Sequence, residues 1–229
     1  MALMKNARRK KDIGINGGMA KWYDKNTRNS RLSEMKWYAD ITADYVEVGA
    51  KILEVAPGPG YLAIELAKKG FSVTGVELSV DFVTIAKRNA EENHVVIDFL
   101  QGNASALPLP DSAFDFIICS AAFKNFSEPL KALNEMHRVL KTNGTALILD
   151  MDYNATKEDI EAELNKLNMK GFDRWFVKLS FKTFLKSGAY TREGFEKLIT
   201  QTSFNTSKIN KHGMGFHVWL YKGNANSRT

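Results

Sequence analysis

The sequence predicts an α/β protein in which helices cover both faces of a mostly parallel sheet. Short apolar runs alternate with segments whose apolar residues recur every three to four positions, as in repeated strand–helix–strand units. One run, Ile52–Val55, leads through a glycine-containing turn into an amphipathic helix over Tyr61–Lys69. With 229 residues, 44% of them hydrophobic, the chain can bury one sizeable core.

The residues before the first strand are expected to form a tail and a cap. Residues 1–12 are basic and resemble a frayed end, and aromatic residues at helical spacing then predict two short helices, over 19–24 and 35–46. We therefore divide the chain into a basic tail with a helical cap, 1–48, and a main domain, 49–229.

The same patterns predict the later elements in chain order. Strands are expected over residues 71–77, 95–100, 114–120 and 145–150, with a closing hairpin over 203–210 and 215–222. Helices are expected over residues 80–92, 130–140, 156–168 and 191–201. Within an insertion at about 153–190, residues 169–188 interleave basic and aromatic side chains. We expect this insertion to cover the ligand site, and a membrane-surface or RNA contact is the alternative.

The turn after the first strand is compatible with two kinds of cofactor, a dinucleotide and a compound that contains a methionine moiety. Gly58 and Gly60 let the backbone approach a ligand closely and, with Ala63, fit the G-x-G-x-x-A dinucleotide pattern, with Glu77 where a ribose-binding acid would lie. Glu54, at the end of the strand, separates the two readings. A carboxylate there repels a pyrophosphate but attracts the amino group of a methionine moiety.

Three motifs in order resemble class I S-adenosylmethionine (SAM)-dependent methyltransferases. Glu54-x-Ala56-x-Gly58-x-Gly60 resembles the nucleotide loop of that family, with Ala56 in place of the usual first glycine. The run Leu-Pro-Leu-Pro-Asp-Ser-Ala-Phe-Asp at 107–115 resembles the ubiquinone-biosynthesis-like (type 11) group, as does the segment 135–150. The resemblance implies a Rossmann-like, seven-stranded, mostly parallel sheet with an antiparallel last strand.

The resemblance also implies SAM as the cofactor and S-adenosyl-L-homocysteine as its product. Glu54 would hold the amino group, Glu77 the ribose hydroxyls, and Asn103, which replaces the usual acid, would accept from the adenine amino group. The cofactor-binding residues expected from the motifs are Glu54, Ala56, Gly58, Gly60, Glu77, Leu78, Asn103, Ala104 and Ser120.

Catalytic groups are harder to assign. Relatives often carry histidines where Lys124 and Asn125 stand, and an aromatic residue such as Tyr23 often lies beside the cofactor and substrate in this family. These three residues are the candidates. A thiolate, amine or stabilised carbanion as acceptor would need no general base, because alignment with the methyl group and exclusion of water supply much of the rate. The histidines are scattered and form no metal-ligand spacing with the single cysteine, so no metal is expected.

We expect a small-molecule acceptor, since the Asn/Asp-Pro-Pro-aromatic tetrapeptide that grips amino groups in adenine or glutamine methylation is absent. Net charge is +7 over residues 1–31, −7 over 32–156 and +6 over 157–229, so the basic flanks keep an RNA methyltransferase open. A non-catalytic SAM-binding protein and a nicotinamide-dependent oxidoreductase are further alternatives. No apolar run could span a bilayer and no signal peptide is evident, which predicts a cytoplasmic protein; peripheral membrane contact and oligomeric state stay open.

Overall fold

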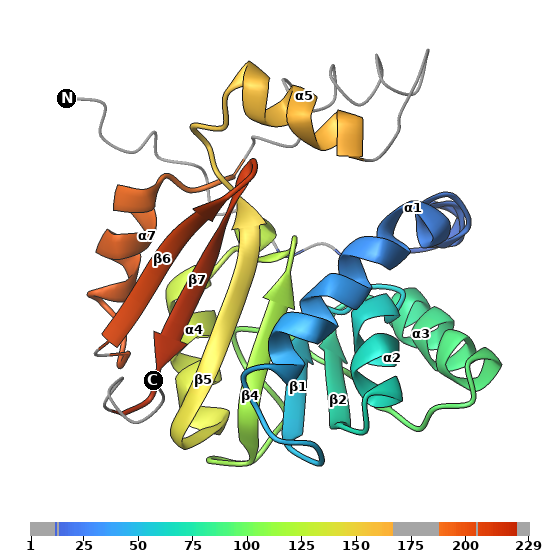
Figure 1. The fold of residues 1–229 in the computed structure, drawn as a ribbon. Helices are drawn as coiled ribbons and strands as arrows, with labels where there is room; N and C mark the ends of the chain where they lie inside the picture. Colours follow the sequence, from blue (N-terminus) through green and yellow to red (C-terminus); the bar gives the residue numbers. More distant parts are fainter. Residues whose placement is uncertain (1–11, 13, 167–187, 205, 224–229) are drawn as a thin grey trace.

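A twisted seven-stranded sheet forms the centre of the protein (Figure 1). The computed structural model describes residue 12 and residues 14–166, 188–204 and 206–223. The strands are β1 (Lys51–Val55), β2 (Ser72–Glu77), β3 (Asp98–Gln101), β4 (Phe114–Ser120), β5 (Leu140–Met151), β6 (Thr206–His212) and β7 (Gly215–Tyr221). Their order is β3-β2-β1-β4-β5-β7-β6, and β7 runs antiparallel to both of its neighbours. The predicted fold class is thus confirmed.

Helices cover both faces of this sheet. Within the described residues they are α1 (Gly18–Ala43), α2 (Tyr61–Lys68), α3 (Val80–Glu92), the 3-10 helix η1 (Phe123–Asn125), α4 (Pro129–Val139), α5 (Lys157–Lys166) and α7 (Arg192–Ile199). Helices α1, α2 and α3 pack on one face, and α4 and α7 on the other (Figure 1). Ser79 caps α3 as predicted, because its hydroxyl accepts a hydrogen bond from the backbone of Phe82 at 3.1 Å.

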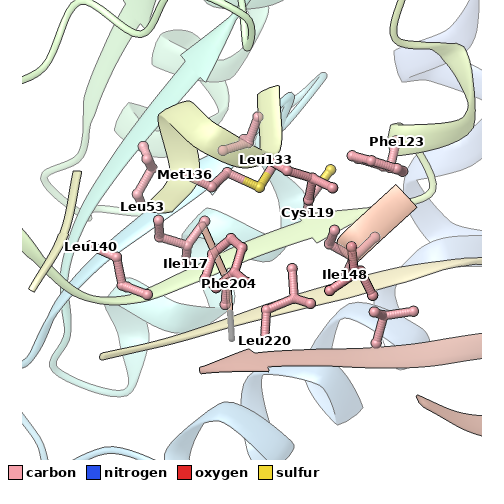
Figure 2. Packing of buried hydrophobic residues seen from close by; sticks show 14 of the residues in the cluster. Leu53, Ile117, Cys119, Phe123, Leu133, Met136, Leu140, Ile148, Phe204 and Leu220 are labelled. Atoms are coloured by element: carbon pink, nitrogen blue, oxygen red, sulfur yellow. The ribbon is translucent and has the colours of Figure 1, made fainter. Parts of the chain in front are cut away.

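Successive side chains along each strand point to opposite faces of the sheet, so the core is divided into two clusters. Leu53 of β1 points into the cluster under α4 and α7, whereas its neighbour Ile52 points into the cluster under α1 and α2. Figure 2 shows the first cluster, in which Ile117 and Cys119 of β4 meet Met136 of α4. Cys119 is fully buried, as expected for a small apolar side chain in a central strand.

Three predicted boundaries were wrong. The two short cap helices are one helix, α1, because the polar stretch between them is held by side-chain contacts to α3 rather than by apolar burial. Strand β3 begins at Asp98, not at residue 95, since pairing with β2 starts there and Val96 is 97% exposed. Strand β5 begins at Leu140, which pairs with Phe114 before a register shift.

The basic and aromatic stretch 169–188 lies, except for its last residue, outside the described residues. Among the helices that are described, none combines the length and apolar character needed to cross a membrane.

Candidate functional site

The glycine loop between β1 and α2 forms an open backbone cradle. Ala56, Gly58 and Gly60 have φ values of 58°, 55° and 82°, in the left-handed region that favours glycine. A side chain at Gly60 would come within 2.9 Å of Phe99, whereas at Gly58 it would meet no atom within 4 Å. Gly58 therefore borders open space, where a ligand can approach the backbone.

Glu54 lies buried behind this loop with an oxygen that lacks a partner. Its side chain accepts a hydrogen bond from the backbone of Ala63 in the first turn of α2, and the residue is only 3% exposed. Its Oε2 atom has no hydrogen-bond partner among the described residues. Burial raises the pKa of Glu54 to about 8, because the charged form loses hydration. Such a group favours a cation placed against it.

Arg31 of α1 lies close enough to Glu54 to act on it electrostatically, and it was missed in the sequence analysis. Its guanidinium donates to the Tyr23 hydroxyl at 3.1 Å and to the Glu34 carboxylate at 3.3 Å. The Glu54 carboxyl, with its unpartnered oxygen, and the Arg31 guanidinium thus interact electrostatically near the glycine loop. No motif marks Arg31, but its spacing of seven residues from Asp24 places both on one face of a single long helix.

Glu77, at the end of β2, is hydrogen-bonded to the backbone of the glycine loop. Its carboxylate accepts from the backbone of Gly58 at 3.0 Å and of Ser79 at 2.9 Å, and burial raises its pKa. Each carboxylate oxygen can accept a second hydrogen bond, so these contacts leave room for sugar hydroxyls. Leu78 is half-buried beside it.

Asn103, after β3, has its oxygen already occupied. Its Oδ1 atom accepts from the backbone and the hydroxyl of Ser105, at 2.9 and 2.8 Å. Its amide donates to Asp12 at 2.9 Å, and the other Asp12 oxygen accepts from the backbone of Ser127 at 2.8 Å. A carboxylate from the N-terminal segment thus lies where the sequence predicted an uncharged acceptor. Ala104 packs against the core beside this group.

Beyond β4 the backbone turns sharply. The hydroxyl of Ser120 is buried without a partner among the described residues, and Ala121 adopts a left-handed φ of 56°. Lys124 bonds through Nζ to Asp150 at 3.2 Å and to the Ala121 carbonyl at 3.1 Å, with side chains 9% and 1% exposed for the ion pair. Lys124 is therefore held as the cation of a buried pair. Asn125 is exposed and does not line the pocket described next.

A pocket of about 490 Å³ adjoins this turn, between α1, the end of β5 and the β6–β7 hairpin. Its lining comprises Ser33, Glu34, Trp37, Tyr38, Ala121, Lys124, Leu149, Asp150, Met151, His212, Met214, Gly215, Phe216 and His217. Of the three predicted catalytic residues, only Lys124 lines it. Tyr23 instead packs edge-on against Phe82, with ring centroids 5.7 Å apart. The expectation that the histidines are scattered was wrong for two of them, because His212 and His217 stack at 4.8 Å.

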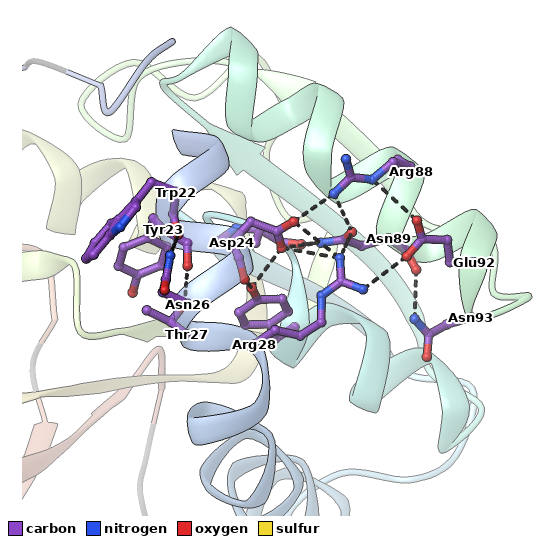
Figure 3. Close-up of polar contacts among 12 residues, drawn as sticks. Trp22, Tyr23, Asp24, Asn26, Thr27, Arg28, Arg88, Asn89, Glu92 and Asn93 are labelled. Atoms are coloured by element: carbon purple, nitrogen blue, oxygen red, sulfur yellow. Dashed lines mark hydrogen bonds and ion pairs between the residues drawn. The ribbon is translucent and has the colours of Figure 1, made fainter. Parts of the chain in front are cut away.

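A buried polar network ties α1 to the glycine loop (Figure 3). Asp24 accepts hydrogen bonds from the Tyr61 hydroxyl at 2.8 Å and from Asn89 at 3.0 Å, and the same Asn89 amide donates to the Pro59 carbonyl in the loop at 2.9 Å. Arg88 adds an ion pair at 2.7 Å. Burial by itself would raise the pKa of Asp24, but these hydrogen bonds outweigh it and lower the pKa. These contacts thus link the cap helix to the glycine loop.

The strand order, the glycine loop after β1 and the acid that ends β2 agree with the fold and motifs that the resemblance to class I SAM-dependent methyltransferases implies. Residues 53–148 match the family described as methyltransferase domain. A demethylmenaquinone methyltransferase of Thermus thermophilus is 38% identical over 102 residues, 44% of this chain and 46% of the relative. An uncharacterized methyltransferase of Bacillus subtilis is 26% identical over 176 residues, 66% of this chain and 70% of the relative.

Solved structures share the fold over nearly the whole chain. A Methanococcus maripaludis protein, provisionally assigned as a SAM-dependent methyltransferase, superposes with a TM-score of 0.74 at 20% identity, covering 95% of this chain and 98% of that one. A SAM-dependent methyltransferase from Aquifex aeolicus gives 0.66 at 19% identity, covering 88% and 96%. The resemblance to class I methyltransferases of the ubiquinone-biosynthesis-like type is thus confirmed. This chain spans about half the length of the demethylmenaquinone methyltransferases that it matches.

Proposed function

We propose that this protein is a SAM-dependent methyltransferase acting on a small-molecule acceptor. One observation carries the proposal: the unpartnered carboxylate oxygen of Glu54 is buried near the Arg31 guanidinium, beyond an open glycine cradle. An α-amino acid carries one positive and one negative group. An ammonium group placed against Glu54 favours its ionised form, so that Glu54 and Arg31 together would complement the methionine end of SAM. A pyrophosphate, which bears only negative charge, would meet the Glu54 carboxylate unfavourably.

The methionine and ribose parts of SAM each have partners among these residues. Glu54 would hold the ammonium group, Arg31 the carboxylate and Glu77 the ribose hydroxyls, with the backbone at Gly58 and Gly60 against the ligand. SAM, when bound, supplies an activated methyl group. The chain's own residues position it, exclude water and orient the acceptor, because these steps convert a bimolecular encounter into an ordered one.

The Asp12 carboxylate refines the adenine part of the proposal. Because the Asn103 oxygen is engaged by Ser105, we infer that Asp12 accepts from the adenine amino group and that Asn103 holds Asp12 in place. Ala104 and Leu78 would then flank the ring.

The acceptor pocket supports a small molecule. Its volume of about 490 Å³ lies within the range of pockets for small ligands, and it begins at Ala121, directly after β4. Among the described residues, no group of three or more His, Cys, Asp or Glu side chains is arranged to hold a metal ion.

The test is an acceptor screen in which release of S-adenosylhomocysteine is measured for thiols, amines, quinone-like phenols and RNA. We expect turnover with a small molecule and none with RNA. Turnover with RNA only would establish the RNA methyltransferase instead. SAM binding without product for any acceptor would support the non-catalytic alternative. A rise in melting temperature with NAD and not with SAM would indicate an oxidoreductase.

A further inference from the structure

Three aromatic rings from distant parts of the chain form one wall of the acceptor pocket. Trp37 of α1 lies 4.7 Å from His212, at the end of β6, and 5.5 Å from His217 of β7, measured between ring centroids. The two imidazoles stack at 4.8 Å with an angle of 16° between their planes. We call this group the Trp37–His212–His217 wall. Ring centroids about 4.5–7 Å apart are typical of attractive aromatic contacts, so the three rings stabilise one another and together form an aromatic surface.

The charged groups that line the pocket are already paired. Glu34 accepts from the Tyr38 hydroxyl at 2.9 Å and from Arg31 at 3.3 Å. Lys124 and Asp150 pair with each other, and Asp150 also accepts two backbone hydrogen bonds. No described lining carboxylate or ammonium is left to neutralise a charged ligand, which favours an uncharged one.

The two imidazoles provide polar atoms within the wall itself. Burial, and then the neighbouring His212, lower the pKa of His217 to about 4, so its ring is neutral at physiological pH. A neutral imidazole has one nitrogen that donates and one that accepts. Within the described part of the chain, the imidazole of neither His212 nor His217 makes a hydrogen bond. An accepting nitrogen therefore remains at the wall for a ligand.

We propose that the Trp37–His212–His217 wall binds the flat ring of an uncharged aromatic acceptor, and that a hydroxyl on this ring donates a hydrogen bond to His217. This inference rests on the proposed function, since Ala121, which lines the pocket, directly follows Ser120 of the expected cofactor site. The stacking surface selects planarity, and the paired charges disfavour ionic ligands. The imidazole nitrogen selects a donor substituent over one that cannot donate.

The test is calorimetric titration of the full chain, in the presence of SAM, with three uncharged probes. The first, 2-naphthol, is flat and has an O–H donor; 2-methoxynaphthalene is flat without the donor; decahydro-2-naphthol has the donor without the flat ring. We expect 2-naphthol to bind about threefold to tenfold more tightly than 2-methoxynaphthalene, the range that one hydrogen bond provides. It should also bind more tightly than decahydro-2-naphthol, which has no flat ring to lie against the wall. Equal affinity for all three, or no binding of 2-naphthol, would overturn the inference.

Variants separate the two features of the wall. His217→Phe keeps a ring and removes the nitrogen, so the preference for 2-naphthol over 2-methoxynaphthalene should disappear. Trp37→Leu should weaken both compounds while preserving their ratio. His94→Asn, at an exposed position with a left-handed φ of 56° far along the chain from the wall, is the matched control and should change nothing.

The SAM affinity of each variant is measured on the same preparation. Unchanged SAM binding shows that the variant is folded and that the proposed function stands, whatever the probes do. If His217→Phe retains the full preference for 2-naphthol, the hydrogen bond is misassigned. If SAM fails to bind the unmodified chain, the proposed function itself fails, and this outcome is distinguishable from a failure of the wall alone.

Discussion

Replacing Glu54 by glutamine should stabilise the ligand-free protein while weakening its binding of SAM. Burial raises the pKa of Glu54 from 4.5 to about 8, so the folded state holds a proton that the unfolded state releases above pH 4.5. A carboxyl whose pKa is raised on folding contributes stability below its unfolded pKa. That contribution is lost as the pH rises from about 4.5 to about 8. Glutamine has a similar shape and does not titrate.

The magnitude follows from the pKa shift. Each pH unit between 4.5 and 7 contributes about 1.4 kcal/mol, so Glu54 lowers the free energy of unfolding at pH 7 by about 3 kcal/mol. For a chain of this size, Glu54→Gln should therefore raise the melting temperature by about 6–12 °C. The loss of a charge-assisted hydrogen bond to an ammonium group should weaken SAM binding by about 10-fold to 100-fold.

Thermal unfolding followed by circular dichroism between pH 4 and 8, together with calorimetric titration of SAM, measures both effects. The stability difference between variant and wild type should grow with pH and vanish below about pH 4.5. Glu91→Gln, at an exposed position on α3, is the control and should show neither effect. A Glu54→Gln protein that melts at a lower temperature than wild type, or that binds SAM with full affinity, would refute the reasoning.

Three further substitutions probe other parts of the site. Asp24→Ala removes the acceptor of two buried donors and should cost about 2–4 kcal/mol in urea unfolding, and a loss under 1 kcal/mol would contradict the network. Glu77→Ala should weaken SAM binding by at least about tenfold in calorimetry; retained affinity would mean that the ribose contact is misassigned. Lys124→Met leaves the Asp150 carboxylate buried without its cation and should cost about 3–5 kcal/mol in the same unfolding assay, whereas an unchanged midpoint would show that the pair is dispensable.

The central strand, the glycine loop and α2 could be predicted because their signals are local. An apolar run, glycines that need left-handed φ, and a helical repeat follow one another within twenty residues. Helix α1 was missed as one element because its middle has no apolar repeat. Arg28 there bonds to Glu92 and Asn89 of α3, contacts between residues more than sixty positions apart.

The Trp37–His212–His217 wall could not be predicted from the sequence for a related reason. His217 pairs with Asn210 across the β6–β7 hairpin, and this register brings His212 near it. Trp37 reaches the same place only because α1 is continuous and lies across the sheet. Arg31 depends on the same helix. Side chains that meet through tertiary packing leave no fixed spacing in the sequence, so the cofactor motifs were recognisable and the acceptor pocket was not.

The central claim is that Glu54 and Arg31, beyond the glycine loop, hold the methionine end of SAM. Equilibrium dialysis of the full chain against labelled SAM, with labelled NAD in a parallel chamber, tests it most directly. We expect saturable binding of one SAM per chain, reduced in Glu54→Gln, and no saturable binding of NAD. A folded protein that retains no SAM, or that binds NAD in its place, would contradict it.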